Sequence, residues 1–106
     1  MSRDNQFMPL YVGDYLADTG HLTAEEHGAY LLLLMAAWTR DGALPADEER
    51  LRALARMDRR QWARSRVAVL AFFVAQDGVL RNARLDRERF RVSKLISKRQ
   101  SAGRAG

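Results

Sequence analysis

An apolar run of ten residues, AYLLLLMAAW at positions 29–38, places the strongest constraint on how this chain folds. It is well short of the about 18 to 20 residues that cross a bilayer, so it predicts a buried segment of a small domain. Thr23 precedes the run at an N-cap position, and Glu26 follows three residues later in the capping-box pattern. Because the run is apolar nearly all round, we expect a central helix over residues 24–39 that neighbouring segments cover on several sides.

The polar triplet in front of this run, Glu25-Glu26-His27, has the residue types of a metal or acid/base site. A metal site on one helix needs a second ligand three or four residues away. The residues at those distances from His27 are not plausible ligands: Thr23, Ala24, Tyr30 and Leu31. Carboxylates in a first helical turn are already stabilised by free backbone amides and the helix dipole. We therefore expect His27 to be structural, hydrogen-bonded to a neighbouring segment and packed on Tyr30 and Leu31.

Gly28 lies inside the predicted helix, where glycine costs about 1 kcal/mol relative to alanine. We expect it to mark a close approach by another backbone, that of the N-terminal segment MPLYVGDY. Within that region residues 7–11, FMPLY, predict an extended edge segment, since Pro9 cannot donate to a ladder. Residues 14–19 predict a short helical turn.

Turn and cap residues divide the chain after the central helix. An Asp-Gly pair at positions 41 and 42 and Pro45 stop that helix. Asp47 is the predicted cap of a second helix that ends near residue 56. Asp58 is the predicted cap of a third helix within MDRRQWARSRVAVLAFF. The sequence therefore predicts two helices joined by a tight turn.

A second Asp-Gly pair, at positions 77 and 78, predicts a two-residue hairpin between FFVAQ and VLRNA. Residues 85–98 predict a weakly anchored helix, and residues 96–106 predict a flexible basic tail. The whole order predicts one domain over residues 1–95, mainly α with a short β-hairpin, about four helices and a winged helix-turn-helix-like arrangement. Eight side chains are expected in its core: Tyr30, Leu31, Leu34, Trp38, Trp62, Val69, Leu70 and Phe73.

Charge is divided unequally along the chain. Residues 1–49 carry two basic and nine acidic residues, whereas residues 50–106 carry sixteen basic and four acidic ones. Arginine makes up 16 of the 18 basic residues, which either favours bidentate contacts with phosphate or carboxylate or reflects a GC-rich genome. The absence of cysteine excludes disulfides and thiolate sites. MSRDNQF lacks the pattern of a signal peptide, so we expect a cytoplasmic protein that does not enter a membrane.

Catalytic apparatus is not visible in the sequence. Most carboxylates occupy cap or turn positions, no serine has a histidine and an acid arranged around it, and there is no phosphate-cradling glycine loop. We therefore expect a protein that is not an enzyme and that uses no cofactor, metal or small-molecule substrate.

Five arginines of the basic half form the candidate nucleic-acid or partner-binding set: Arg59, Arg60, Arg64, Arg81 and Arg84. In a winged helix-turn-helix the second of the paired helices enters the DNA major groove. The first three arginines lie near the start of that predicted helix, and the last two lie on or beside the wing. The alternative that stays open is a merely solvated basic face, because clustered charge attracts nucleic acid without forming a specific site.

The sequence also resembles a known family. Over about residues 7–92 its segments follow the order of the YdaU-like domain of phage and prophage proteins: MPLYVGDYLADTGHLTAEEHGAYLLLL, then W and GALPAD, then W, VLAFF, DG and R. The resemblance implies a winged-helix fold like that at the front of phage replication initiators and replisome organisers, which bind origin DNA and recruit the helicase loader. It does not imply an enzyme. Such proteins usually continue into a linker and a partner-binding region, whereas this sequence ends at KRQSAGRAG.

Three functions follow as expectations. In length and in its lack of catalytic apparatus, the chain is similar to small type I anti-CRISPR proteins. The first expected function is therefore inhibition of a host CRISPR surveillance complex or its nuclease through an acidic N-terminal surface. The second is a duplex DNA-binding domain of the replication-initiator type. The third is a phage transcriptional regulator, which would need a dimer to read paired half-sites. Each would act in the cytoplasm of a phage-infected or lysogenic bacterium.

Overall fold

The computed structural model describes residues 7–105, with side chains described for residues 7–99. The first six residues of the predicted domain and Gly106 of the predicted tail lie outside the described residues. Within this range the elements are α1 (Val12–Asp18), α2 (Ala24–Trp38), β1 (Ala43–Pro45), α3 (Glu48–Leu54), α4 (Arg59–Leu70), β2 (Val74–Gln76), β3 (Val79–Arg81) and α5 (Ala83–Ala105). The described chain is mainly helical with one small antiparallel sheet, as predicted, and has five helices where about four are expected.

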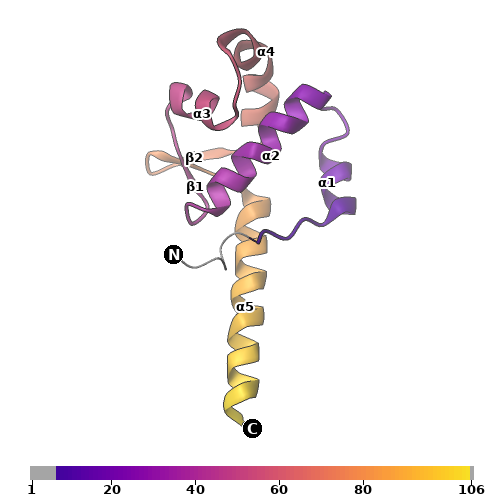
Figure 1. Ribbon diagram of the computed structural model, residues 1–106, viewed down its shortest axis with the longest axis vertical. Helices are drawn as coiled ribbons and strands as arrows, with labels where there is room; N and C mark the ends of the chain where they lie inside the picture. The colour runs from indigo at the N-terminus through magenta and orange to yellow at the C-terminus, as the bar shows by residue number, and fades with distance from the viewer. Residues whose placement is uncertain (1–6, 106) are drawn as a thin grey trace.

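Helix α2 is the element around which the others pack (Figure 1). Its predicted cap is confirmed, since the Thr23 hydroxyl accepts from the Glu26 backbone amide at 3.1 Å and the Glu26 carboxylate accepts from the Thr23 amide at 2.8 Å. The helix ends at Trp38, and Asp41 and Gly42 then adopt positive φ angles of 56° and 87°. Since α3, α4, α5 and β1 all contact α2, the prediction of a helix covered on several sides is confirmed.

Helices α3 and α4 form the predicted pair, each with its predicted cap. The Asp47 carboxylate accepts from the Arg50 amide at 3.0 Å. The Asp58 carboxylate accepts from the Gln61 amide at 2.8 Å, and the Gln61 side chain accepts from the Asp58 amide at 2.9 Å, which completes a capping box. Arg56, with φ of 57°, turns the chain between the two helices. This is the tight connection of a helix-turn-helix.

The predicted hairpin is confirmed, and a third strand joins it. Asp77 and Gly78 connect β2 to β3 with φ angles of 53° and 81°, as a type I′ turn requires. Strand β1 pairs antiparallel with the other side of β3, placing Leu44 opposite Leu80 and giving the order β1-β3-β2. Leu44 is fully buried, so β1 ties the hairpin to the body of the domain. A helix pair followed by a hairpin held in this way is winged-helix-like.

The core agrees closely with the predicted set. Six of the eight expected side chains are buried: Tyr30, Leu34, Trp38, Trp62, Val69 and Phe73. The other two, Leu31 and Leu70, are partly buried and pack against this cluster. The structure adds buried side chains from every element except the hairpin strands and the N-terminal segment, among them Tyr15, Leu33, Leu44, Leu51 and Leu85.

Two predictions for the N-terminal region are wrong. Gly28 is exposed, and a Cβ built on it would meet no atom within 4 Å, so no backbone approaches it closely. Residues 7–11 form no strand. They lead into a full helix, α1, because Tyr15 is buried and its ring lies 6.0 Å from that of Tyr30, which anchors a helix on α2. The segment before α1 lies beside α5, where the Arg91 guanidinium is 5.1 Å from the centroid of the Tyr11 ring.

Replacing Gly28 with alanine is expected to raise the free energy of unfolding by about 1 kcal/mol, because alanine favours the helix and its methyl group meets open space. Urea denaturation measures the change. The contrasting variant is Gly78→Ala, which also meets open space but has a φ of 81° that alanine tolerates poorly, so it should lower stability. A loss of stability in Gly28→Ala would contradict this account of the helix.

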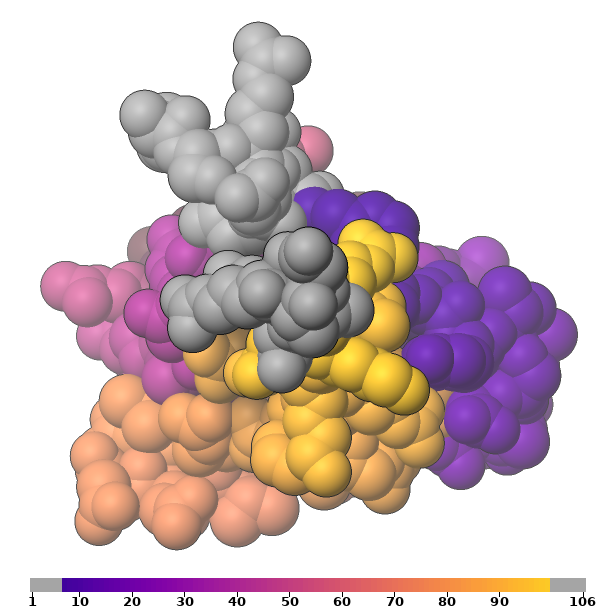
Figure 2. All heavy atoms as spheres, turned by 90° about the horizontal axis from the view of Figure 1, so that it is seen from below, coloured from indigo at the N-terminus to yellow at the C-terminus, as the bar shows by residue number. Residues whose placement is uncertain are grey.

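Helix α5 leaves the body of the domain and contributes to a molecule 57 Å long (Figure 1). Leu85 at its start is buried, whereas Leu95 and Ile96 are about half exposed, as expected for a weakly anchored helix. Seen from below, α1 lies on one side of α5 and the β2–β3 hairpin lies on the other (Figure 2). The helix continues to Ala105, past its predicted end near residue 98. The flexibility of residues 96–106 stays a prediction.

Candidate nucleic-acid interface

Arg59 and Arg60 lie in the first turn of α4, where both residues are exposed. Neither forms an ion pair with a carboxylate of the described residues. Asp58 fixes the start of the helix by accepting from the backbone amide of Gln61. The two guanidinium groups can therefore reach phosphate oxygens without breaking an internal contact.

Arg64 is held against α2 by Glu25. Its Nε donates to Glu25 Oε1 at 2.8 Å and its Nη2 donates to Glu25 Oε2 at 2.7 Å, while the Ser65 hydroxyl donates to Oε1 at 3.1 Å. The hydrogen bonds from Arg64 hold the pKa of the Glu25 carboxyl below its usual value. Glu25 thus joins the start of α2 to the middle of α4, a role beyond the dipole partner expected from the sequence.

A second ion pair joins α4 to α3. Arg66 pairs with Glu48, and the Trp62 indole Nε1 donates to Glu48 Oε1 at 3.3 Å. Arg64 and Arg66 therefore reach from α4 to two different neighbouring helices. These contacts hold α4 against α2 and against α3.

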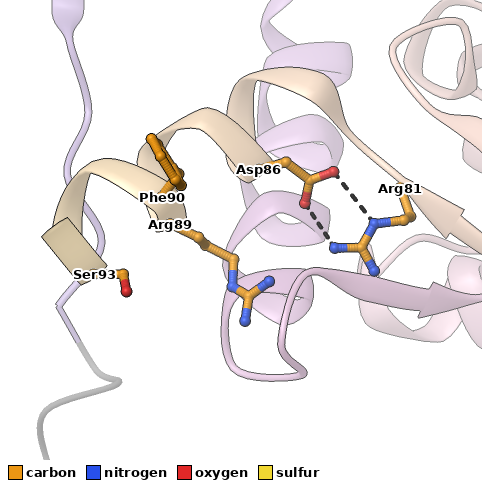
Figure 3. Close-up of a pocket in the computed structure, with 5 residues that line it drawn as sticks. All are labelled: Arg81, Asp86, Arg89, Phe90 and Ser93. Carbon is orange, nitrogen blue, oxygen red and sulfur yellow. Dashed lines mark hydrogen bonds and ion pairs between the residues drawn. The ribbon is translucent and has the colours of Figure 1, made fainter.

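Arg81, at the end of β3, forms a two-bond ion pair with Asp86 of α5 (Figure 3). Its Nε donates to Asp86 Oδ2 at 3.2 Å and its Nη2 donates to Oδ1 at 2.8 Å. The hydrogen bonds to the Asp86 carboxylate raise the pKa of the Arg81 guanidinium above its usual value. About a third of the Arg81 side chain remains exposed beside the hairpin.

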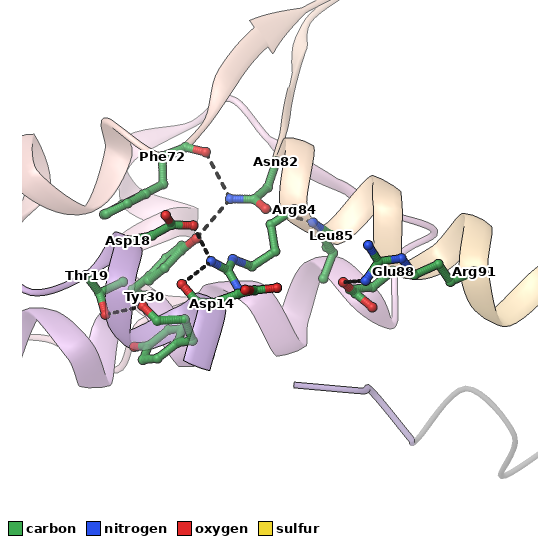
Figure 4. A network of polar contacts seen from close by, with 11 residues as sticks. Asp14, Asp18, Thr19, Tyr30, Phe72, Asn82, Arg84, Leu85, Glu88 and Arg91 are labelled. Carbon is green, nitrogen blue, oxygen red and sulfur yellow. Dashed lines mark hydrogen bonds and ion pairs between the residues drawn. The ribbon is translucent and has the colours of Figure 1, made fainter. Parts of the chain in front are cut away.

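Arg84 joins α5 to α1 (Figure 4). Its Nη2 donates to the Asp14 carbonyl at 2.9 Å, and the guanidinium pairs with the Asp18 carboxylate. Only 10% of its side chain is exposed. The five predicted arginines thus lie in four places: the start of α4, the contact between α4 and α2, the junction of α5 with the hairpin, and the junction of α5 with α1.

Most of the observed ion pairs connect the acidic part of the chain to the basic part. Five of the seven ion pairs among the described residues join a carboxylate within residues 1–49 to an arginine within residues 50–106: Glu49–Arg52, Glu25–Arg64, Glu48–Arg66, Asp18–Arg84 and Asp41–Arg89. Part of the charge difference between the two halves is therefore neutralised by ion pairs inside the fold.

Asn82 is a structural residue that the sequence does not single out. Its Nδ2 donates to Tyr30 Oη at 3.2 Å and to the Phe72 carbonyl at 2.9 Å, and its Oδ1 accepts from the Leu85 amide at 2.9 Å (Figure 4). It therefore caps α5 and fixes that helix to α2 and to the segment after α4. An asparagine three residues before a helical leucine was the only local signal, because the other two partners are distant in sequence.

His27 makes the kind of contact expected of a structural histidine. Its Nδ1 lies 2.7 Å from the Tyr15 hydroxyl of α1, and the two ring centroids are 5.5 Å apart. The predicted hydrogen bond to a neighbouring segment is thereby confirmed. Among residues 7–105 no group of three or more His, Cys, Asp or Glu side chains is placed to hold a metal ion.

Across the part of the chain that the structure describes, none of the helices has the length and apolar character needed to span a membrane.

Comparison with known proteins places the chain in a family. The family described as "Protein of unknown function (DUF1376)" matches residues 6–89. A curated relative, "Uncharacterized protein YdaU" of Escherichia coli (strain K12), is 37% identical over 99 residues, which are 93% of this chain and 34% of the relative. The chain thus spans about a third of the length of that relative, and no solved structure matches it. The resemblance over residues 7–92 is confirmed, and the chain belongs to the YdaU-like DUF1376 family.

Proposed function

We propose that this domain binds duplex DNA through the start of α4 and the neighbouring hairpin. The observation that carries the proposal is the pair Arg59 and Arg60, which are exposed and have no ion-pair partner among the described carboxylates. They lie in the first turn of the second helix of a helix pair, and a hairpin follows that helix. This is where winged helix-turn-helix domains contact phosphates and base edges.

Arg64 supports the same surface, although it is already paired. A guanidinium group has five N–H donors, of which Glu25 uses two, and 60% of the Arg64 side chain is exposed. Its remaining donors can bind a phosphate while the ion pair persists. Arg81 has a similar arrangement beside the hairpin, whereas the nearly buried Arg84 supports the junction of α5 with α1.

A salt titration of duplex binding tests the proposal. Each neutralised phosphate lowers log K by about 0.9 per unit of log salt concentration, so contacts from Arg59 and Arg60 alone predict a slope of about −2. Fluorescence anisotropy with a labelled duplex of mixed sequence measures the slope. Absence of any binding at low salt would remove DNA binding as the function.

Replacing Glu25 with glutamine is expected to tighten duplex binding about threefold, because the change releases Arg64 and removes a nearby negative charge. Fluorescence anisotropy at fixed salt measures the affinity. The matched control is Glu26→Gln, which makes the same charge change one residue away, keeps a capping-box acceptor for the Thr23 amide and does not contact Arg64. Equal affinities of the two variants would mean that Arg64 does not take part.

Two more specific functions, replication initiation and transcriptional regulation, differ in the partners and the oligomeric state that they require. A replication-initiator domain would deliver partners to bound origin DNA, whereas a transcriptional regulator would read paired half-sites as a dimer. Light scattering on the free protein and on its DNA complex separates the two. A protein that stays a monomer on DNA argues against the regulator.

Inhibition of a type I CRISPR surveillance complex or its nuclease has weaker support. It depends on a separate acidic surface, yet Asp18, Glu25 and Glu48 are each paired with an arginine of the basic half. A pull-down with purified surveillance complex, together with a target-DNA cleavage assay, tests it. Unchanged interference and no association would contradict inhibition.

A further inference from the structure

A hollow of about 340 Å³ lies between the end of the hairpin and the first turns of α5 (Figure 3). Its lining side chains come from β3 and from one side of α5: Arg81, Asp86, Arg89, Phe90 and Ser93. Gly42, in the turn between α2 and β1, lies close to the Arg81, Asp86 and Arg89 side chains. The α2–β1 turn and the β3–α5 region, which are distant in sequence, therefore meet beside this hollow.

Gly42 lets two guanidinium groups come together there. A Cβ on this residue would lie 2.9 Å from Arg89 Nη1, a distance that real Cβ atoms almost never show, and 3.0 Å from Arg81 Nη2, which is tighter than most Cβ contacts. The same position would be 3.1 Å from Asp86 Oδ1. Because all three atoms converge on one point, Arg81 and Arg89 are close neighbours, and one carboxylate lies with them.

Two guanidinium groups and one carboxylate line the hollow. Asp86 accepts two hydrogen bonds from Arg81. Arg89 pairs with Asp41 at 3.6 Å, and the Asp41 side chain, which does not line the hollow, is fully exposed. About two thirds of the Arg81 and Arg89 side chains are shielded from solvent. Both guanidinium groups therefore keep N–H donors that their carboxylate partners do not use.

The hollow offers more donors than a carboxylate needs. A carboxylate has two oxygens and is bound by the two parallel N–H groups of one guanidinium, whereas a phosphate group has a third oxygen for a further donor. Arg81, Arg89 and Ser93 all line the hollow, so two guanidinium groups and one hydroxyl are available there. Phe90, which is 62% exposed, adds an apolar wall beside these donors.

We propose that Arg81, Arg89 and Ser93 form a binding site for a phosphate group, with the Phe90 ring beside the group that carries the phosphate. The phosphate belongs either to a nucleic-acid strand or to a free phosphate or nucleotide. In the first case the site adds α5 to the DNA contacts of the hairpin and rests on the proposed function. In the second case it is independent of duplex binding.

The first experiment uses inorganic phosphate and the whole chain. The Nε–Hε signals of Arg81 and Arg89 are followed by NMR during titration with phosphate, and with acetate and chloride at the same ionic strength. We expect a saturable shift with phosphate alone. Arg89→Gln should weaken phosphate binding about tenfold, and Ser93→Ala should weaken it less.

The matched control is Arg87→Gln, which makes the same charge change on the same helix but lines a different hollow, with Asp14 and Asp18. It should bind phosphate as the unchanged protein does. Equal weakening in Arg87→Gln and Arg89→Gln, equal saturable shifts with acetate, or shifts that never saturate would each overturn the site. Thermal unfolding of every variant confirms that the compared proteins are folded.

A second experiment separates the two sources of the phosphate and keeps this proposal distinct from the proposed function. If duplex binding weakens in Arg89→Gln but not in Arg87→Gln, the site takes a backbone phosphate. If adenosine monophosphate or inorganic phosphate binds through Arg89 while no duplex binds, the site stands and DNA binding fails. If the duplex binds equally to both variants and phosphate gives no saturable shift, the phosphate site is wrong while DNA binding stands.

Discussion

Replacing Asn82 with alanine is expected to lower the free energy of unfolding by about 3 kcal/mol. The change removes the cap of α5, typically worth about 1 kcal/mol, because no side chain then accepts from the Leu85 amide. It also removes the donor to the Phe72 carbonyl and to the Tyr30 hydroxyl, and a buried group left without its partner costs about 1 to 3 kcal/mol. Urea denaturation with linear extrapolation measures the loss.

Asn82→Ser separates the two contributions. Serine is a good N-cap, so this variant should recover about 1 kcal/mol of the loss while leaving the Phe72 carbonyl and the Tyr30 hydroxyl without the amide donor. A loss of less than about 1 kcal/mol in Asn82→Ala would show that the long-range bonds contribute nothing. Full recovery in Asn82→Ser would lead to the same conclusion.

The parts of the fold that sequence predicts correctly are those specified by residues close together in the chain. Thr23 and Glu26 specify the start of α2 because both halves of the capping box lie within one helical turn. Asp77 and Gly78 specify the hairpin because a type I′ turn needs two residues that tolerate positive φ. A capping box and a type I′ turn are specified by neighbouring residues, whatever the rest of the fold is.

Contacts between distant residues are the parts that the sequence does not reveal. Glu25 has a complete explanation as a first-turn acid, and nothing local indicates that it pairs with Arg64. Strand β1 has only three residues, and the Asp-Gly pair before it and the proline at its end are equally good signals for the end of a helix. Gly28 shows the opposite error, because a helix glycine suggests a close contact that the packed structure does not make.

The candidate site residues also divide into positions specified by nearby residues and contacts between distant residues. Arg59 and Arg60 are exposed at the start of α4, a position that depends only on the Asp58 cap and on helical geometry. Arg64, Arg81 and Arg84 fall in ion pairs whose carboxylates no sequence pattern identifies. Arg89, which the sequence shows only as one of many basic residues of the last helix, becomes notable because Gly42 brings it beside Arg81.

The double variant Arg59→Ala with Arg60→Ala is expected to weaken duplex binding about tenfold at low salt and to reduce the salt slope by about two. Both side chains are exposed and neither pairs with a described carboxylate, so their removal should leave stability nearly unchanged. Fluorescence anisotropy at several salt concentrations measures affinity and slope together. Arg64 is left in place, since its removal would also break the pair with Glu25 and confuse binding with stability.

The charge-matched control for this variant is Lys98→Ala with Arg99→Ala, which removes two exposed cations from the projecting part of α5. If attraction to DNA came only from the net charge of the protein, both double variants would weaken binding equally. A contact surface at the start of α4 predicts instead that the α4 variant loses most of the affinity and the α5 variant little. Equal losses would leave only a solvated basic surface, and the assignment of α4 as the DNA-contacting helix would then be wrong.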